Sequence, residues 1–176
     1  KDGENTYIEE YEEEEVVELK NNLTKAGYTL IGWKLNNKEY KLTDEFTMIA
    51  EDITLEAIWE LIIPDIEKTS EYKVKENIIT GILLGTTIEN LELGLEDIYE
   101  VKIYNKKQEV KTEGNIATSD KLKIYLGYTL VSEYTLSVKG DVTGTGTSTV
   151  SDVAKLYQYL KKKIDMEDCY KEAGNV

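Results

Sequence analysis

The stretch Gly140–Asp152, which reads G-D-V-T-G-T-G-T-S-T-V-S-D, decides the fold of the C-terminal part of the chain. Counted from Asp141 as position 1, oxygen-bearing side chains stand at positions 3, 5, 7, 9 and 12, and Gly146 stands at position 6. A twelve-residue calcium loop needs oxygen ligands at these positions and a glycine at position 6 for its sharp turn. The spacing therefore predicts a calcium-type loop with these ligands: Asp141, Thr143, Thr145, Thr147, Thr149 and Asp152.

Threonine occupies positions 3 and 5 of this loop, where carboxylates or amides are usual. Only Asp141 and Asp152 bring full negative charges, and calcium affinity follows the number of charged ligands. We therefore expect, at best, binding in the weak extracellular class, with Kd on the order of 10⁻⁴ to 10⁻³ M. Two alternatives stay open, namely a loop that folds without metal and one that uses water or Na⁺.

An amphipathic helix is expected directly after the loop. Its apolar residues recur at helical spacing: Val153, Leu156, Tyr157 and Leu160. The pattern G-D-V-x-G-x-G, a closing Asp and then V-A-x-L-x-x-Y-L resembles the first repeat of a type I dockerin. This resemblance implies calcium-dependent docking to a cohesin-like protein domain, with Val150 and Ser151, at loop positions 10 and 11, as partner contacts.

A second repeat is indicated towards the C-terminal end. Ile164–Asp168 is expected to start a short helix with Asp165 as its cap, and Gly174–Val176 echoes Gly140–Val142 at an offset of 34 residues. We expect the chain to stop just after the first position of a second loop, so that residues 140–176 form a truncated dockerin.

Two breaks divide the rest of the chain. Pro64, the only proline, lies where strand-like alternation lapses into polar residues, and a second break falls at Val138–Gly140. We therefore predict an N-terminal domain over residues 1–62, a linker over 63–70 and a second domain over 71–139. The expected fold class is α+β.

The N-terminal domain is expected to consist mainly of strands. Gly27–Trp33 reads G-Y-T-L-x-G-W and Ile53–Trp59 reads I-T-L-x-A-x-W, and both alternate as strands do. With a polar stretch and Tyr40 between them, these motifs resemble the internalin B-type repeat of bacterial surface proteins, which implies a small β-grasp-like fold. The two closing tryptophans are predicted to form the core, and the alternative is that they are sugar-stacking platforms.

The second domain is predicted to be strand, short helix and then three strands. Alternation indicates these strands: Tyr72–Val74, Ile78–Ile82, Tyr99–Tyr104, Leu122–Leu126 and Tyr134–Val138. Thr86–Glu89 has the form of a capping box, and Ile88, Leu91 and Leu95 would share one helix face. Residues 72–139, which include T-G-I, G-T-T and A-T-S-D motifs, are also similar to a module often found before dockerins, and a spacer role is expected.

Composition narrows the possible partners and chemistry. The formal charge is −14, every base is lysine, and the chain has no histidine. Nucleic acid would be repelled, and the commonest general base and transition-metal ligand is missing, so we expect neither nucleic-acid binding nor catalysis. A membrane span is not expected, because the chain has no apolar run of roughly 18 residues. Cys169, the only cysteine, is predicted to be a buried small hydrophobe.

These features predict a non-catalytic C-terminal region of a secreted or cell-surface bacterial protein. It would be monomeric, would space or present modules, and would dock to a cohesin-like partner. The alternative is an adhesin or ligand-binding module that recognises a glycan or a host protein, which the internalin-type repeat and the 13 tyrosines favour.

Overall fold

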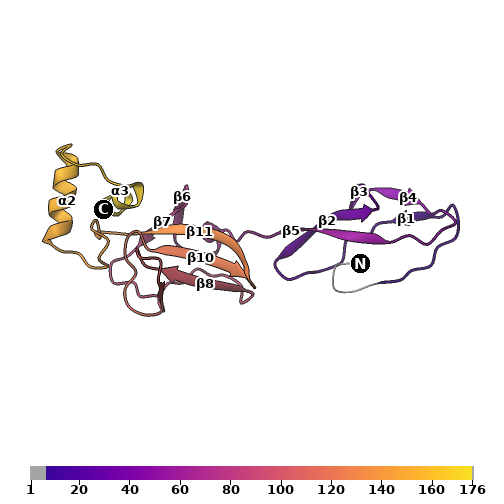
Figure 1. Ribbon diagram of the computed structural model, residues 1–176, viewed down its shortest axis with the longest axis horizontal. Helices are drawn as coiled ribbons and strands as arrows, with labels where there is room; N and C mark the ends of the chain where they lie inside the picture. The colour runs from indigo at the N-terminus through magenta and orange to yellow at the C-terminus, as the bar shows by residue number, and fades with distance from the viewer. Residues whose placement is uncertain (1–6, 176) are drawn as a thin grey trace. The chain divides into compact units, whose positions relative to one another are not determined.

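The computed structural model describes residues 7–175 and divides into two compact units between Ile62 and Ile63 (Figure 1). Strands predominate and three helices lie in the second unit of the described chain, so the α+β prediction is confirmed. Val176, the last residue of the predicted second glycine-containing triplet, lies outside the described residues.

The first unit is built from two antiparallel sheets. β1 (Val16–Glu18) pairs with β4 (Glu45–Thr47), and a three-stranded sheet has the order β3-β2-β5. The strands of this larger sheet are β2 (Tyr28–Leu35), β3 (Lys38–Lys41) and β5 (Leu55–Leu61). The alternation in both tryptophan motifs thus predicted strands correctly.

Trp33 lies at the centre of the first unit. Its side chain is only 6% exposed and packs with Leu19 and Leu30. The register sets Trp33 opposite Ala57 and Leu30 opposite Trp59, so both tryptophans take part in one cluster. The prediction that the tryptophans form the core is confirmed for Trp33, whereas Trp59 is partly buried and packs against that core.

The second unit contains a six-stranded sheet in the order β6-β7-β11-β10-β8-β9. Its strands are β6 (Lys73–Lys75), β7 (Ile78–Ile82), β8 (Tyr99–Tyr104), β9 (Val110–Lys111), β10 (Lys121–Leu126) and β11 (Thr129–Val138). β7 and β11 run parallel and the other neighbours run antiparallel. Each of the five predicted strands is present, and β11 begins earlier than predicted.

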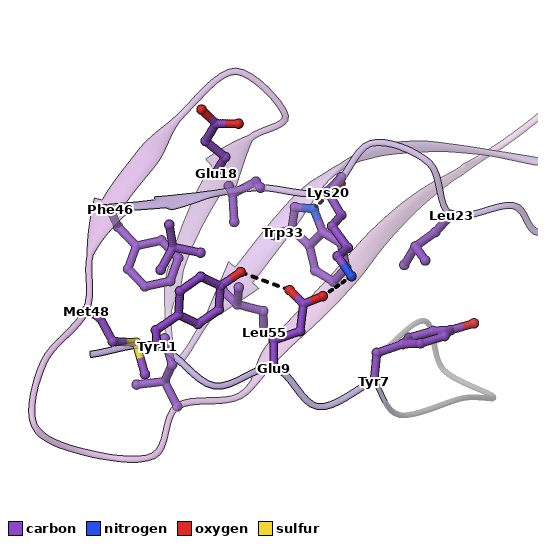
Figure 2. Close-up of a pocket in the computed structure, with 13 residues that line it drawn as sticks. Tyr7, Glu9, Tyr11, Glu18, Lys20, Leu23, Trp33, Phe46, Met48 and Leu55 are labelled. Atoms are coloured by element: carbon purple, nitrogen blue, oxygen red, sulfur yellow. Dashed lines mark hydrogen bonds and ion pairs between the residues drawn. The ribbon is translucent and has the colours of Figure 1, made fainter. Parts of the chain in front are cut away.

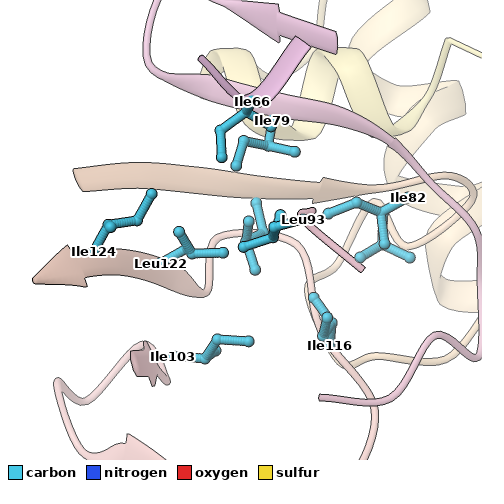
Figure 3. Packing of buried hydrophobic residues seen from close by; sticks show 10 residues of the cluster. Ile66, Ile79, Ile82, Leu93, Ile103, Ile116, Leu122 and Ile124 are labelled. Carbon is cyan, nitrogen blue, oxygen red and sulfur yellow. The ribbon is translucent and has the colours of Figure 1, made fainter. Parts of the chain in front are cut away.

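The core of the second unit is almost entirely aliphatic. Side chains from α1, from four strands and from the irregular segments between them meet on one face of the sheet (Figure 3). The buried members are Ile66, Ile79, Ile82, Leu93, Ile103, Ile116, Leu122, Ile124, Leu136 and Val138. Burial of this many branched side chains is the main stabilising contribution expected for the unit.

The helix predicted after Thr86 is absent, and that prediction is wrong. The backbone of this segment instead bonds to a distant one: Ile88 N–H donates to the Gly114 carbonyl, and Ile116 N–H donates to the Thr86 carbonyl. Gly94 then takes a left-handed conformation (φ +62°), and a Cβ there would lie 2.0 Å from the Thr69 carbonyl oxygen. The apolar residues still face the core, but from irregular chain.

The predicted linker over 63–70 is also wrong, because this segment is folded. It contains α1 (Ile66–Thr69), and the Ile66 side chain is 1% exposed within the core of the second unit. Pro64, which suggested a boundary, is itself buried. Because most residues around Ile66 are polar, the sequence suggested a linker, although the Ile66 side chain anchors this segment in the core.

The C-terminal segment forms α2 (Val150–Leu160) and α3 (Asp168–Ala173). α3 packs on β11 and β7, and Figure 1 shows α2 farther from the sheet. Ser137 Oγ donates to the Cys169 carbonyl at 2.8 Å. Residues 71–139 and 140–175 therefore share one compact unit, although the sequence suggested separate modules.

The start of α3 differs from the prediction. The helix begins at Asp168, and its N-terminal flanking residue Glu167 makes no side-chain cap. Asp165, the predicted cap, accepts a hydrogen bond from the next backbone amide, of Met166, and stays outside the helix. Cys169 is 4% exposed, which confirms that it is buried, and burial is the main cause that raises the pKa of its thiol.

Candidate functional site

The loop Gly140–Asp152 joins the end of β11 to the start of α2. Gly140, Gly144 and Gly146 all have left-handed backbone angles, with φ of +84°, +70° and +75°. Gly146 therefore makes the sharp turn that its position 6 predicted. At the two ends of the loop, Asp141 is fully buried and Asp152 is 2% exposed.

Asp141 ties the loop to the sheet domain. One carboxylate oxygen accepts a hydrogen bond from Thr145 N–H at 2.7 Å. The other accepts from Gly146 N–H at 2.9 Å and from Thr118 N–H at 2.8 Å. Because Thr118 lies 23 residues earlier in the chain, its amide fixes the loop against the turn before β10.

Asp152 closes the other end of the loop through two threonines. Thr143 donates to one carboxylate oxygen from its N–H at 2.8 Å and its hydroxyl at 2.7 Å. Thr149 donates to the other from its N–H at 2.7 Å and its hydroxyl at 3.0 Å, as part of a capping box at the start of α2. Burial by itself would raise the pKa of Asp152, but these hydrogen bonds outweigh it and hold the pKa below its usual value.

The middle of the loop is bonded within itself. Thr145 Oγ1 lies 3.2 Å from the Thr147 carbonyl oxygen and 3.1 Å from Thr147 Oγ1. Two lysines reach the loop from outside: Lys106 Nζ donates to the Thr143 carbonyl at 2.9 Å, and Lys155 Nζ donates to the Val142 carbonyl at 2.8 Å. Neither lysine was predicted to belong to this site, because both contacts depend on the folded structure.

The predicted ligands therefore lie together, and their hydroxyls and amides are hydrogen-bonded to one another or to the two carboxylates. Calcium takes six to eight oxygen acceptors, whereas the hydroxyls of Thr143 and Thr149 point their protons at Asp152. A carboxylate has about four lone-pair sites, and Asp152 already accepts four hydrogen bonds. Among residues 7–175, no group of three or more His, Cys, Asp or Glu side chains is placed to hold a metal.

The two predicted partner contacts are accessible. Val150 is 84% exposed, and Ser151 beside it is also exposed. They begin a row along α2 that continues at helical spacing through Val153, Tyr157 and Leu160, all more than half exposed. We call Val150, Val153, Tyr157 and Leu160 the α2 stripe.

A second candidate site lies in the first unit (Figure 2), where a cavity of about 140 Å³ opens beside Trp33. Its floor comes from the sheets, and a strand-free N-terminal arm, residues 7–11, covers one side. The lining is mostly apolar or aromatic: Tyr7, Tyr11, Val17, Leu19, Leu23, Trp33, Phe46, Met48, Ile53 and Leu55. Glu9, Glu18 and Lys20 are its charged members.

Glu9 holds the arm in place. Its carboxylate pairs with Lys20 and accepts a hydrogen bond from the Tyr11 hydroxyl at 2.9 Å. The bond from Lys20, followed by that from Tyr11, lowers the pKa of Glu9. The indole N–H of Trp33 donates a hydrogen bond to the Lys20 carbonyl at 2.9 Å, so the polar group of this buried side chain has a partner.

Comparison with family models, curated proteins and solved structures found no match to this chain. None of the helices within residues 7–175 has the length and apolar character needed to cross a membrane. The cavity was not predicted from the sequence, because its lining residues come from five separate segments of the chain. The contact of Asp141 with the distant Thr118 amide was likewise not predicted.

Proposed function

We propose that this chain is a non-catalytic region of a secreted or cell-surface bacterial protein that docks to a cohesin-like domain through the α2 stripe. The single observation that carries the proposal is the outward-facing apolar row on α2. An amphipathic helix normally turns such a row toward its own core, and exposed apolar patches mark interaction sites.

Contacts at the first turn of α2 and on the side away from the α2 stripe hold this helix in place. Its first turn is fixed by Asp152, and Lys155 Nζ lies 3.9 Å from the centre of the Tyr170 ring on the opposite side from the stripe's solvent face. A rigid helix with apolar anchors at such spacing suits docking into a groove of a partner domain. The resemblance to a dockerin favours a cohesin-like domain as that partner.

Charge adds a second property of the partner. Lys161, Lys162 and Lys163 are exposed directly after the stripe, in a chain whose net charge is −14. A surface that is apolar in the middle and acidic at one edge would complement this arrangement and would speed association. The rest of the described chain would act as a spacer that presents α2, a role for which the dockerin-associated resemblance of residues 72–139 also argues.

The proposal is tested with the full chain and a panel of purified type I cohesin domains, measured by calorimetry with and without calcium. We expect one or more domains to bind, and Tyr157→Glu to weaken that binding at least about 10-fold. Tyr128→Glu is the matched control, because Tyr128 is fully exposed on the turn between β10 and β11. Docking through this face is wrong if no cohesin binds or if both variants bind equally well.

The cavity beside Trp33 favours a second candidate function, in which the first unit binds a protein ligand. A cavity of about 140 Å³ has room for one aromatic or branched side chain, and its lining is mainly apolar. Glycan stacking is less favoured, because Trp33 presents almost no surface. Titration of the full chain with N-acetylphenylalaninamide should shift the NMR signal of the Trp33 indole N–H, and a Val17→Phe variant should abolish the shift by filling the cavity. An unchanged signal would remove this candidate.

A further inference from the structure

We infer that the loop Gly140–Asp152 closes without a metal ion, because its threonine hydroxyls supply the protons that balance its buried oxygens. A calcium loop gathers acceptors only, and the cation is what makes their convergence favourable. In this loop donors alternate with acceptors. The inference concerns the loop itself and needs no partner, while its consequence for docking rests on the function proposed above.

Positions 3, 9 and 12 of the loop form one hydrogen-bonded group. In a calcium site all three would turn oxygen lone pairs toward the ion. Here Thr143 and Thr149 each donate a hydroxyl and a backbone amide to Asp152, at 2.7 to 3.0 Å. A calcium ion bound by Asp152 would have to compete for lone pairs that already accept four charge-assisted hydrogen bonds, which are roughly twice as strong as neutral ones.

Positions 5 and 7 of the loop are hydrogen-bonded to each other. Position 7 of a calcium loop contributes its backbone carbonyl as a ligand. In this chain the Thr147 carbonyl accepts a hydrogen bond from the Thr145 hydroxyl at 3.2 Å. The residue that should be a neighbouring ligand therefore satisfies the carbonyl instead.

Position 1 keeps its structural role. Asp141 accepts the amides of Thr145 and Gly146, which hold the turn, and also the amide of Thr118 outside the loop. These three donors compensate the desolvation of the buried carboxylate, because each N–H points the positive end of its dipole at a carboxylate oxygen. Asp141 thus needs no cation either.

Two fixed ammonium groups complete the balance. Lys106 and Lys155 contact the carbonyls of Thr143 and Val142 on the outside of the loop. Both positive charges lie next to ligand positions, and like charge disfavours a divalent cation nearby. The loop therefore carries its own compensating charge.

The closed loop also fixes α2, since Asp152 belongs to its first turn. The α2 stripe is consequently formed with or without calcium. We expect docking by this chain to be independent of calcium, in contrast to what the resemblance to a dockerin implied.

The test is a calcium titration of the full chain by calorimetry, with thermal unfolding in calcium and in EDTA. We expect no saturable heat at millimolar calcium and the same Tm in both solutions. The variant Thr143→Asp/Thr145→Asp should gain both a saturable heat, with Kd on the order of 10⁻⁴ to 10⁻³ M, and a Tm that rises with calcium. Saturable calcium binding by the native chain with a higher Tm would overturn the inference.

A second variant tests the hydrogen bonds themselves. Thr143→Val/Thr149→Val keeps the shape of both side chains and removes both hydroxyl donors, so Tm should fall equally in calcium and in EDTA. Unchanged Tm would also overturn the inference. Failure of docking is distinguishable: cohesin binding that appears only in calcium refutes metal-free closure alone, whereas a calcium-indifferent chain that binds no cohesin refutes docking alone.

Discussion

The two C-terminal helices, α2 and α3, have similar apolar content and opposite surroundings. α3 buries Cys169 and Ala173 against the sheet, and Gly140 N–H donates to the Ala173 carbonyl at 2.9 Å. α2 buries only Asp152 and turns its apolar stripe to solvent. α3 is held by burial of its apolar face, and α2 by polar contacts at its N-terminal end and through Lys155 on one side.

This difference shows that an apolar helical pattern does not say what the helix packs against. A buried side chain contributes about 25 cal/mol for each Å² of apolar surface removed from water, and α3 obtains that contribution from its own unit. α2 leaves its stripe outside and is positioned by hydrogen bonds instead. Its apolar surface stays available for another molecule.

The same substitution on the two helices should separate these situations most strongly. Ala173→Glu would place a charge at a side chain that is 0% exposed, and we expect a loss of about 3 kcal/mol or more in the free energy of unfolding. Ala154→Glu, at an exposed position of α2, should change it by no more than about 0.5 kcal/mol. Urea unfolding of both variants tests this, and equal losses would contradict the comparison.

The N-terminal caps should give the next largest difference. Thr149 caps α2 with its side chain, whereas Glu167 makes no side-chain cap on α3. Thr149→Ala should cost about 1 kcal/mol, within the range of measured cap losses. Glu167→Ala is the matched control and should leave the free energy of unfolding nearly unchanged. The measurement is urea unfolding, and similar small losses in both would show that the capping box does not hold α2.

The strands were the most predictable part of the fold. Residues 99–103 alternate between apolar or aromatic and charged residues, and β8 (Tyr99–Tyr104) contains them. The half-buried faces of a mostly antiparallel sheet impose a period of two on the sequence, so local reading is enough. Neither the neighbours of each strand nor the parallel pairing of β7 with β11 follows from that period.

The failed helix shows where local reading ends. Ile88, Leu91 and Leu95 have helical spacing, yet they reach the core from irregular chain whose partners lie near Gly114. Long-range backbone pairing overrode a short periodic pattern. The glycine at position 94 was the one sign against a helix in the sequence, because glycine disfavours helix interiors. In the structure Gly94 is left-handed and packs tightly against Thr69 of α1, which a regular helix would not allow.

The candidate site was half predictable. The positions of its oxygen atoms follow from the sequence, because loop spacing is local. Whether a threonine hydroxyl donates or accepts does not, since the group can do either and its neighbours decide. The contacts from Thr118 and Lys106 depend on the folded sheet, and lie 23 and 37 residues from their partners in the loop.

Acid should weaken the attachment of α2 through Asp152. Its folded pKa is lowered, so its contribution to stability is fully present above the unfolded pKa, about 3.9, and is lost as pH falls through the folded pKa. Urea unfolding of the native chain and of Thr143→Val/Thr149→Val should therefore differ more at pH 7 than at pH 3. A difference that stays constant with pH would show that these hydroxyls do not stabilise the ionised carboxylate.

The smallest expected effect concerns the contact that joins the two helices. Lys155, on α2, places its ammonium group 3.9 Å from the ring centre of Tyr170, on α3. Lys155→Met keeps much of the aliphatic packing and removes the charge, and we expect a loss of about 0.5 to 1 kcal/mol in the free energy of unfolding, typical of a cation–π contact that is not fully buried.

Part of any loss would come from the hydrogen bond of Lys155 to the Val142 carbonyl. A double-mutant cycle with Tyr170→Leu separates the two, since only the ring contact contributes a coupling energy between these positions. A coupling energy near zero would mean that the contact between Lys155 and the Tyr170 ring does not help to position α2.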